Sequence, residues 1–478
     1  MSLAEQQQLE ETYVMHTFGR KPVELVEGEG MVVRDDAGKE YLDFIAGIGA
    51  VSLGHCHPAV VRAITEQAST LIHVSNYYYI EHRGQVGKLL SDALNEDVPA
   101  ADQAPWQTFF ANSGAEANEC AIKLARAYAR RRVEAEGGDG EAAPRVIVTV
   151  KKSFHGRTLA TLAATAQPAK QELFQPLPDG FTPTPQNDIA ALEALFEAQG
   201  DSICAVMLEP IQGESGVHPC SPEFMAAVRR LTSERHALMI CDEVQCGIYR
   251  TGKPFGFQNY DVVPDIVSIA KGVASGFPCG MCAACGEVAA AFKPGDHGST
   301  FGGSNLAVAA AEATLSEIQK ENLAANAIEV GAYLREQLSA LPQVTEVRGM
   351  EGLKEATYNI AGLEVKVAVA SGLTAANHVM SMIKDGTAPW TFVEIMCCPG
   401  GCINGGGQPI VPAVVRNFEN YRAKRAKVLY DMDRDMPLRK SHQNPMVVEI
   451  YKDYFESFGS HKAHEVLHTH YTARKKFR

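Results

Sequence analysis

The sequence lacks the features of a membrane or secreted protein. No apolar run approaches the ~18 residues that a membrane-spanning helix needs, and the first 21 residues are polar rather than the apolar stretch of a signal peptide. Basic residues are also in short supply, with 44 Lys and Arg against 57 Asp and Glu. This acidity argues against nucleic acid or an anionic membrane as the main partner. We therefore expect a cytoplasmic protein.

The charge is unevenly distributed along the 478 residues. Residues 1–352 contain 27 basic and 45 acidic side chains, whereas residues 353–478 contain 17 basic and 12 acidic ones. A reversal of sign within one chain indicates two parts with different surfaces.

The first part alternates short apolar runs with amphipathic helical stretches. This alternation predicts an α/β fold with a mostly parallel sheet and helices on both faces. The expected strands are 107–110, 145–150, 203–209, 237–242 and 265–270, and the expected helices are 115–129, 189–198 and 221–235. In such sheets ligands bind beyond the carboxyl ends of the strands, so the residues that follow each strand are the candidates for a site.

These strand ends carry a chemically coherent set of residues. The small-residue turn Asn112–Asn118 opens a helix and suits a phosphate. Phe154 can cover a flat ring and Arg157 can bind a carboxylate. Asp242 and Lys271 end two further strands, and a lysine at a buried sheet edge is a candidate Schiff-base amine. A phosphate turn, a stacking ring, an aspartate and a lysine together fit pyridoxal phosphate.

The same positions resemble the class III aminotransferases, a family of fold-type-I pyridoxal-phosphate enzymes. The resemblance covers residues 12–350, and its residues are closest to the acetylornithine type. The motifs that carry it are Gly54–Pro58, Asn112–Asn118, Phe154–Thr158, Glu209–Glu214, Asp242–Gln245, Lys271 and Ser299–Gly303.

The resemblance implies a role for each site residue. Lys271 would form the Schiff base, and Asp242 would hold the pyridine nitrogen. The other cofactor contacts would be Ser113, Gly114 and Ala115 to the phosphate, Phe154 on the ring and Gln245 near the ring hydroxyl. Arg157 and Glu214 would meet the substrate. Thr300 would reach the phosphate of a neighbouring subunit, because the family builds its sites at the interface of a homodimer.

The family's C-terminal domain is missing from the sequence pattern. That domain supplies an arginine that binds the carboxylate of glutamate or 2-oxoglutarate and pairs with the glutamate that matches Glu214. Only Arg434 stands in a vaguely similar context. We therefore expect Glu214 to lack its usual partner, and amino transfer to 2-oxoglutarate to be impaired.

The second part resembles the C-terminal end of an iron–iron hydrogenase. The motif Phe392–Pro409 contains Cys398 and Cys402, which match cluster ligands of that family, and Arg422–Tyr471 resembles its small-subunit segment. Two thiolates cannot hold a four-cysteine cluster, so we do not expect hydrogenase activity. The resemblance implies four segments: 1–55 and 56–350 of the aminotransferase, then a hydrogenase-like fragment at 351–415 and a helical tail at 416–478, in a small α+β or helical segment that replaces the usual small domain.

Two further patterns resemble metal sites, and we predict no metal at either. His464–His468 has the His-Glu-x-x-His pattern of zinc proteases but no suitable third ligand downstream. Cys279, Cys282 and Cys285 have iron–sulfur spacing, but on a strand Cys282 would point to the opposite side. We expect these cysteines to be buried and reduced.

Three functions follow from these observations. The first is a transaminase that exchanges the δ-amino group of N-acetylornithine, or of a similar ω-amino acid, with 2-oxoglutarate. The second is a protein that binds pyridoxal phosphate but cannot complete turnover. The third is a redox or iron–sulfur protein built on the C-terminal cysteines, which iron content would distinguish from the other two.

Overall fold

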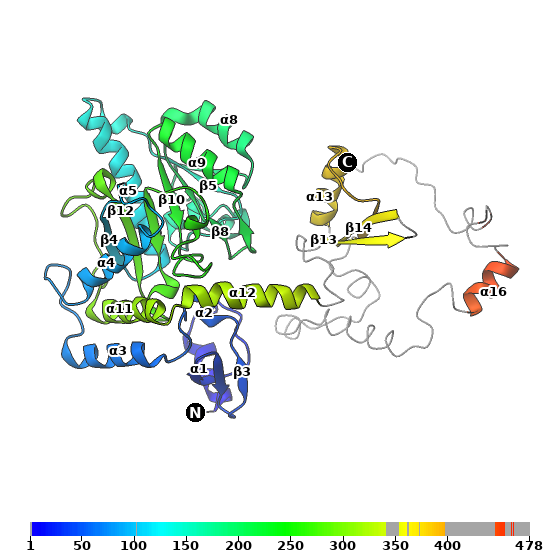
Figure 1. Ribbon diagram of the computed structural model, residues 1–478, viewed down its shortest axis with the longest axis horizontal. Helices are drawn as coiled ribbons and strands as arrows, with labels where there is room; N and C mark the ends of the chain where they lie inside the picture. The colour runs from blue at the N-terminus through cyan, green and yellow to red at the C-terminus, as the bar shows by residue number, and fades with distance from the viewer. Residues whose placement is uncertain are drawn as a thin grey trace. The chain divides into compact units, whose positions relative to one another are not determined.

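The computed structural model describes residues 2–101, 103–340, 353–360, 363–371, 373–396, 445–454, 460 and 462 (Figure 1). The chain forms two compact units. The first comprises residues 1–7 and 23–336, and the second comprises residues 8–22 and 337–478. Among the described residues no helix combines the length and the apolar character needed to cross a membrane.

A seven-stranded sheet forms the centre of the first unit. Its strands, in spatial order, are β4 (Trp106–Ala111), β12 (Gly280–Cys285), β11 (Ile266–Ile269), β10 (Leu238–Asp242), β7 (Ile203–Leu208), β5 (Val146–Val150) and β6 (Phe181–Thr184). All neighbouring pairs are parallel except those of β12, which runs antiparallel to both β4 and β11. Every residue of β7 and β10 is buried, as expected for strands covered on both faces. The expected mostly parallel sheet is therefore confirmed.

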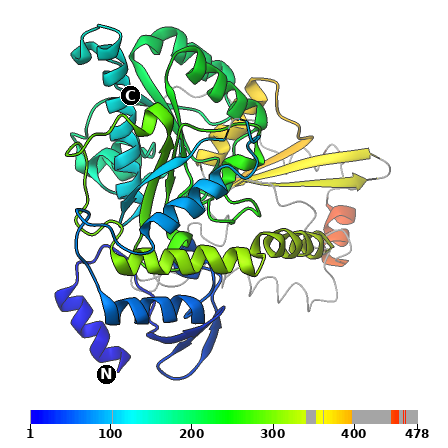
Figure 2. The ribbon, with the colours of Figure 1, turned by 60° about the vertical axis from the view of Figure 1, so that its left-hand side comes forward.

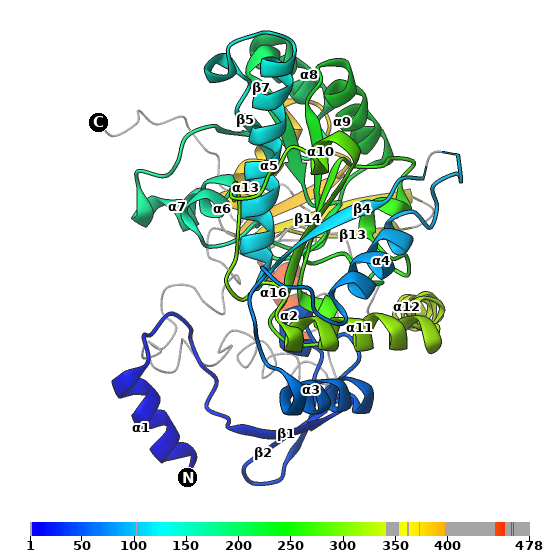
Figure 3. The ribbon, with the colours of Figure 1, turned by 90° about the vertical axis from the view of Figure 1, so that its left-hand side faces the viewer.

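Helices cover both faces of this sheet, as predicted (Figures 2 and 3). Helix α5 (Gly114–Ala135) packs on one face through its alanine-rich side. The other face is covered by α4 (Arg83–Leu94), α8 (Ile189–Gln199), α9 (Pro222–Glu234) and α11 (Asn305–Lys320).

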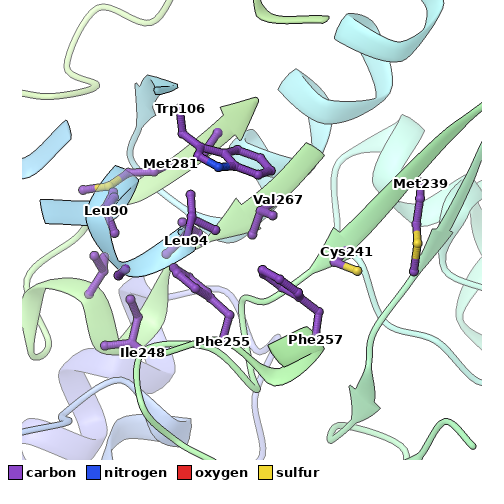
Figure 4. Close-up of a cluster of buried hydrophobic side chains, with 14 of the residues drawn as sticks. Leu90, Leu94, Trp106, Met239, Cys241, Ile248, Phe255, Phe257, Val267 and Met281 are labelled. Atoms are coloured by element: carbon purple, nitrogen blue, oxygen red, sulfur yellow. The ribbon is translucent and has the colours of Figure 1, made fainter. Parts of the chain in front are cut away.

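The larger of the two cores lies on the side of α4 and α11. Leu90 and Leu94 of α4 point into it, as do Phe255 and Phe257, which precede β11 (Figure 4). The two phenylalanine rings stack with their centroids 6.0 Å apart. This core supports the loops that follow the strands, where the candidate site lies.

The cysteines of β12 separate between the two faces. Cys282 is buried on the α5 side, whereas Cys279 is buried in the opposite core and Cys285 is partly buried against it. This is the alternation that the spacing predicts for a strand, and the expectation that Cys282 points away from the other two is confirmed.

The remaining elements of the first unit are short or peripheral. Its other helices are α2 (Ala46–Gly49), α3 (Pro58–Thr70), α6 (Leu159–Ala164), α7 (Pro168–Gln171), α10 (Gly286–Ala289) and α12 (Leu323–Ala340). Two small sheets add β1 (Leu25–Glu29), β2 (Val32–Asp35) and β3 (Glu40–Leu42), and β8 (Ile211–Gln212) with β9 (His218–Pro219). Helix α1 (Leu3–Tyr13) contributes residues to both units, because residues 8–22 belong to the second.

The second unit contains a three-stranded sheet of order β13-β14-β15. Its elements are β13 (Leu353–Ile360), β14 (Leu363–Ser371), α13 (Leu373–Lys384), β15 (Phe392–Met396) and α16 (Pro445–Asp453). Strand β14 pairs antiparallel with β13 and parallel with β15, and Ala368, Ala370 and Val379 form a small core. The predictions for Cys398, Cys402, Arg434 and His464–His468 lie outside the described residues.

Candidate active site

A cavity of about 390 Å³ opens at the carboxyl ends of β4, β5, β7, β10 and β11. Nine of the ten predicted site residues line it: Ser113, Gly114, Ala115, Phe154, Arg157, Glu214, Asp242, Gln245 and Lys271. The tenth, Thr300, is exposed and does not belong to the lining. Residues that are up to 158 positions apart in the sequence thus meet at one edge of the sheet, as the strand-end argument expects.

The turn after β4 presents the N-terminus of the 22-residue helix α5 to this cavity. The Ser113 hydroxyl caps the helix by accepting a hydrogen bond from the Glu116 N–H at 3.2 Å. The Glu116 carboxylate in turn accepts hydrogen bonds from the backbone and side-chain nitrogens of Asn112, at 2.7 and 2.9 Å. The first N–H groups of a helix have no partner within it, so this turn offers donors and a positive dipole end to an anion.

The turn fits closely against the neighbouring loops. A Cβ atom at Gly114 would lie 2.7 Å from a methyl group of Val244, and one at Gly280 would lie 2.2 Å from the Ser113 carbonyl oxygen. Neither position tolerates a side chain without displacing the turn. The absence of a side chain at Gly114 and at Gly280 therefore allows the backbone at 113–115 to pack in this position.

Asp242 ends β10 and is 2% exposed. Its Oδ2 atom accepts hydrogen bonds from Asn118 Nδ2 and His155 Nδ1, both at 2.7 Å, and its Oδ1 atom accepts one from the Val244 N–H at 3.0 Å. Three fixed groups thus orient one carboxylate that faces the cavity.

Asn118 and His155 are site residues that the sequence interpretation did not select. Burial alone would lower the pKa of His155, but its hydrogen bond to Asp242 and the charges of Asp242 and Glu209 raise it. A protonated His155 would compensate the buried Asp242 charge. The available signals were the helical spacing of Asn118 from Gly114, four residues apart, and the position of His155 directly after Phe154.

Lys271 begins a short 3₁₀ helix (Lys271–Ala274) after β11 and has a left-handed φ of 46°. Backbone strain of this kind is common at functional positions. The Lys271 Nζ atom donates a hydrogen bond to Gln245 Oε1. Burial lowers the pKa of Lys271, and Asp242 and Glu209 only partly offset this effect. A lowered pKa increases the fraction of neutral, nucleophilic amine.

Glu209 is a second buried carboxyl group in the lining, 4% exposed. Its Oε1 atom accepts a hydrogen bond from the Phe154 N–H at 2.9 Å, which fixes the backbone that carries the Phe154 ring. Burial raises the pKa of Glu209 to about 7.

Glu214 has partners, and the expectation that it would be left unpaired is wrong. Lys170 of α7 forms an ion pair with it, and Gln167 Nε2 donates a hydrogen bond to its Oε2 atom at 3.0 Å. Burial alone would raise the pKa of Glu214, but the hydrogen bonds from Lys170 and Gln167 lower it. The sequence argument failed because it considered only a C-terminal arginine as the partner, whereas the cation comes from a helix 44 residues upstream.

These residues fit pyridoxal phosphate. The capped, glycine-lined turn suits its phosphate, the oriented Asp242 suits a pyridine nitrogen, and the Lys271 amine with lowered pKa suits its aldehyde. All three groups line one cavity together with the Phe154 ring.

Comparison with known families agrees with this arrangement. Residues 14–375 match the family model of class-III aminotransferases, and residues 419–474 match that of the iron hydrogenase small subunit. The aminotransferase match thus extends beyond residue 350, and most of the hydrogenase match falls outside the described residues.

Relatives with similar sequences are named acetylornithine aminotransferases. The chain is 49% identical over 344 residues to that of Caldanaerobacter subterraneus, covering 71% of this chain and 82% of the relative. It is 44% identical over 361 residues to that of Methanocaldococcus jannaschii, covering 75% and 86%.

Solved structures of related enzymes have the same fold. Acetylornithine aminotransferase from Elizabethkingia anophelis superposes with a TM-score of 0.62 at 33% identity, covering 80% of this chain and 90% of that one. Ornithine aminotransferase from Toxoplasma gondii, whose active site holds pyridoxal phosphate at partial occupancy, superposes with a TM-score of 0.65 at 30% identity, covering 74% and 82%. The chain therefore belongs to the class-III aminotransferases and is a pyridoxal-phosphate-dependent enzyme similar to the acetylornithine aminotransferases.

Proposed function

We propose that this enzyme transfers the δ-amino group of N-acetylornithine, or the terminal amino group of a similar ω-amino acid, to 2-oxoglutarate. The observation that carries the proposal is the convergence of Lys271, Asp242 and Arg157 on one cavity. The similar relatives are named acetylornithine aminotransferases, which supports this choice of substrate class.

Each residue has a defined task in this proposal. When bound, pyridoxal phosphate supplies an aldehyde that exchanges amines and a ring that accepts electrons. The Lys271 amine would hold the cofactor and move the substrate proton, and Asp242 would keep the pyridine nitrogen protonated. Ser113, Gly114 and Ala115 bind the phosphate, Phe154 covers the ring and Gln245 approaches its hydroxyl group.

Arg157 and Glu214 provide the contacts to the substrate. Arg157 is exposed in the cavity lining and, within the described part of the chain, forms no ion pair or hydrogen bond. A guanidinium group in this state suits the carboxylate of an amino-acid donor. Glu214 adds a negative charge to the same cavity lining, which favours a neutral acylated group over a second carboxylate.

Amino transfer to 2-oxoglutarate is the weaker half of the reaction in this proposal. The sequence offers no C-terminal arginine in the family's pattern, and the Glu214 carboxylate opposes a dicarboxylate. If 2-oxoglutarate does not react at all, the protein binds the cofactor but cannot complete turnover. The iron–sulfur alternative rests on Cys398 and Cys402, which lie outside the described residues, and no described contact favours it.

We infer that the working enzyme is a homodimer. Large apolar side chains are exposed on the first unit, among them Phe44 (88%), Tyr77 (95%), Tyr79 (106%) and Phe301 (62%). A partner surface would cover such side chains. Thr300, adjacent to Phe301, would then reach the phosphate site of the partner, because it does not line the cavity of its own chain.

The division of the chain also remains a proposal. We infer an aminotransferase at 1–55 and 56–350, a hydrogenase-like fragment at 351–415 and a helical tail at 416–478. The charge reversal between residues 352 and 353 supports the boundary at 350, and the hydrogenase match at 419–474 supports the boundary at 415.

The proposed function is tested by separating the two halves of the reaction. The cofactor-loaded enzyme is mixed with N-acetylornithine in a stopped-flow spectrometer, and the change in visible absorbance is followed. It is then mixed with 2-oxoglutarate to restore the spectrum. We expect the first change to occur and the second to be slow or to need high concentrations. The absence of any spectral change with N-acetylornithine and related ω-amino acids would contradict the proposal.

A further inference from the structure

Two buried cysteines meet where helix α5 packs against strand β12 (Figure 1). Cys120 of α5 is 1% exposed and Cys282 of β12 is 2% exposed, and both belong to the core on the α5 side of the sheet. Their thiol groups form a hydrogen bond with each other. Both are free cysteines, so this is the reduced form of the pair.

Cys120 also faces two basic side chains. His297, in the loop between α10 and α11, forms a hydrogen bond with the Cys120 thiol. The His297 ring lies with its centroid 4.6 Å from that of Phe109, the residue that pairs with Cys282 across the two strands. Lys123, three residues after Cys120 on the same face of α5, has its Nζ atom 2.9 Å from His297 Nδ1. Groups from β12, from α5 and from the loop therefore surround this one thiol.

These neighbours make Cys120 the more acidic thiol of the pair. The hydrogen bond from Cys282, together with His297 and Lys123, lowers the pKa of Cys120 to about 6, although burial opposes this shift. The hydrogen bond to Cys120 and burial raise the pKa of Cys282 well above its ordinary value. The thiolate is the nucleophilic form of cysteine, so Cys120 is the reactive member and Cys282 is a thiol held beside it.

Burial in the same core does not by itself give a cysteine these properties. Cys204 is also 2% exposed and belongs to the same core, but burial raises its pKa to about 12. Among the described residues no thiol or histidine forms a hydrogen bond with it. The contacts of Cys120 therefore distinguish it from an ordinary buried thiol.

The cysteine pair joins the two elements that hold the phosphate turn. Helix α5 begins at Gly114, six residues before Cys120. Strand β12 begins at Gly280, two residues before Cys282. The start of β12 is in tight contact with the turn, because a Cβ atom at Gly280 would lie 2.2 Å from the Ser113 carbonyl oxygen. A covalent bond brings two sulfur atoms closer than a hydrogen bond does, so oxidation would draw α5 and β12 together and displace the turn.

The loop that contains His297 gives a second connection to the same turn. The Ser299 hydroxyl, two residues after His297, accepts a hydrogen bond from Asn112 Nδ2 at 3.1 Å. Oxidation of Cys120 would remove the anionic partner of His297. The change would therefore also reach this loop, which continues to Thr300.

We propose that Cys120 and Cys282 are a thiol pair that a hydroperoxide oxidises to a disulfide, and that this bond weakens the binding of pyridoxal phosphate. The proposal concerns the cofactor site alone, so it does not depend on which amine the enzyme accepts.

The oxidation takes two steps and consumes one molecule of hydrogen peroxide. The Cys120 thiolate attacks one peroxide oxygen, the O–O bond breaks, and Cys120 becomes a sulfenic acid while the departing hydroxide takes up a proton to form water. The Cys282 sulfur then attacks the Cys120 sulfur, the S–O bond breaks, and the second hydroxide leaves with the Cys282 proton as water. The two thiols lose two electrons, and the peroxide is reduced to two molecules of water.

The disulfide is detected by peptide mapping of the full chain. Cofactor-free protein is incubated with hydrogen peroxide, the remaining thiols are alkylated in denaturant, and the peptides are identified by mass spectrometry. We expect a linked Cys120–Cys282 peptide that dithiothreitol removes, formed slowly because both thiols are buried. In Cys282→Ala the reaction should stop at the sulfenic acid of Cys120, which dimedone traps. If the pair stays reduced at peroxide concentrations that oxidise the exposed Cys56, the proposal is wrong.

The effect on the cofactor is measured by fluorescence titration with pyridoxal phosphate. We expect oxidised wild-type protein to bind the cofactor at least several-fold more weakly than reduced protein, and dithiothreitol to restore the affinity. The affinity of Cys120→Ala should not respond to peroxide. Unchanged affinity in protein that contains the disulfide would overturn the proposed effect on the cofactor.

Cys204→Ala is the matched control, because it removes an equally buried thiol from the same core. It should form the Cys120–Cys282 disulfide and respond to peroxide as the wild type does, and loss of the response in this variant would contradict the proposal. The melting temperature identifies variants that fold, with Cys120→Ser as the replacement if Cys120→Ala does not. An enzyme that shows the peroxide response but ignores all ω-amino donors would refute the proposed function and not the role of the cysteine pair.

Discussion

At the scale of single residues, the site is organised around carboxylates whose partners differ. Asp242 accepts hydrogen bonds from Asn118, His155 and a backbone N–H. Glu209 and Glu243 are equally buried but lack a directly bonded cation among the described residues. Neighbouring buried carboxyl groups therefore differ in whether a hydrogen-bonded cation contacts them.

Replacing Lys271 tests the assignment of the reacting amine. Lys271→Ala should bind pyridoxal phosphate without the visible absorbance that the lysine-bound cofactor gives, because the substitution removes the amine that would bond to the cofactor. The measurement is an absorbance spectrum of purified protein after the cofactor is supplied and the excess removed. Lys88→Ala is the matched control and should remain yellow. A colourless wild-type protein under the same conditions would contradict the assignment.

Glu243 should make stability depend on pH. Burial raises its pKa to about 7 from 4.5, although hydrogen bonds from Gly256, Phe257 and Cys246 oppose this shift. The folded state then keeps a proton that the unfolded chain releases above pH 4.5, so the free energy of unfolding falls as the pH rises from about 4.5 to 7. The contribution is on the order of 3 kcal/mol.

The measurement is urea unfolding between pH 5 and pH 8, with the cofactor absent. Glu243→Gln should flatten the decrease in unfolding free energy relative to the wild type, because glutamine does not titrate. Glu223→Gln, at an exposed position of α9, should leave the slope unchanged. An unchanged slope in Glu243→Gln would show that this carboxyl group does not titrate in the range.

The residue scale is also where sequence reasoning was least complete. The search of strand ends correctly predicted nine residues of the cavity lining, because the carboxyl ends of neighbouring strands lie together whatever their separation in sequence. It missed Lys170, His155 and Asn118, whose roles depend on side-chain contacts between separate loops. A lysine in a polar stretch has no sequence signal that distinguishes a solvated charge from the partner of Glu214.

At the scale of elements, the phosphate turn depends on a strand that is distant in sequence. Strand β12 pairs with β4 so that Gly280 faces Ala111, next to the start of α5. Alternation of apolar runs with helical stretches predicted β4, β5, β7, β10 and β11 but not β6. It could not predict that β12 enters antiparallel between β4 and β11, because that pairing depends on tertiary packing rather than on local periodicity.

Gly280→Ala should weaken cofactor binding through this contact. The added Cβ atom would lie 2.2 Å from the Ser113 carbonyl oxygen, so the turn or the strand has to move. Overpacking of this kind costs about 1–3 kcal/mol, and we expect at least a several-fold loss of affinity in a fluorescence titration with pyridoxal phosphate. Gly87→Ala, in α4 with open space around it, is the control and should be neutral or stabilising. Normal affinity in Gly280→Ala would show that the turn can shift without affecting the phosphate.

At the scale of the whole molecule, the exposed aromatic residues predict assembly. We expect sedimentation equilibrium to give a dimer, and Phe44→Asp combined with Tyr79→Asp to shift it toward the monomer, because both residues expose most of their side chains in the single chain. The double substitution should also weaken cofactor binding if Thr300 of one subunit completes the site of the other. A monomeric wild type at micromolar concentration would contradict this prediction.

From the cysteine and histidine patterns of the hydrogenase-like part we predict that the protein binds no metal. Elemental analysis of anaerobically purified protein should find neither iron nor zinc in stoichiometric amounts, because Cys398, Cys402 and the histidine pattern at His464–His468 each lack ligands. Cys282 lies on the opposite face of β12 from Cys279, which removes the third candidate. One metal ion per chain that is lost in Cys398→Ser or His464→Ala would overturn this prediction.

The position of β12 between β4 and β11 has a consequence for biosynthesis. Among the described strands β12 is the only sheet partner of β4, and it is synthesised about 170 residues after β4. Until β12 is made, the phosphate turn has no strand beside it and the edge of β4 has to remain unpaired without associating elsewhere. The nascent chain therefore binds the cofactor only late in its synthesis. Before that point the unpaired edge of β4 makes the chain most prone to aggregation.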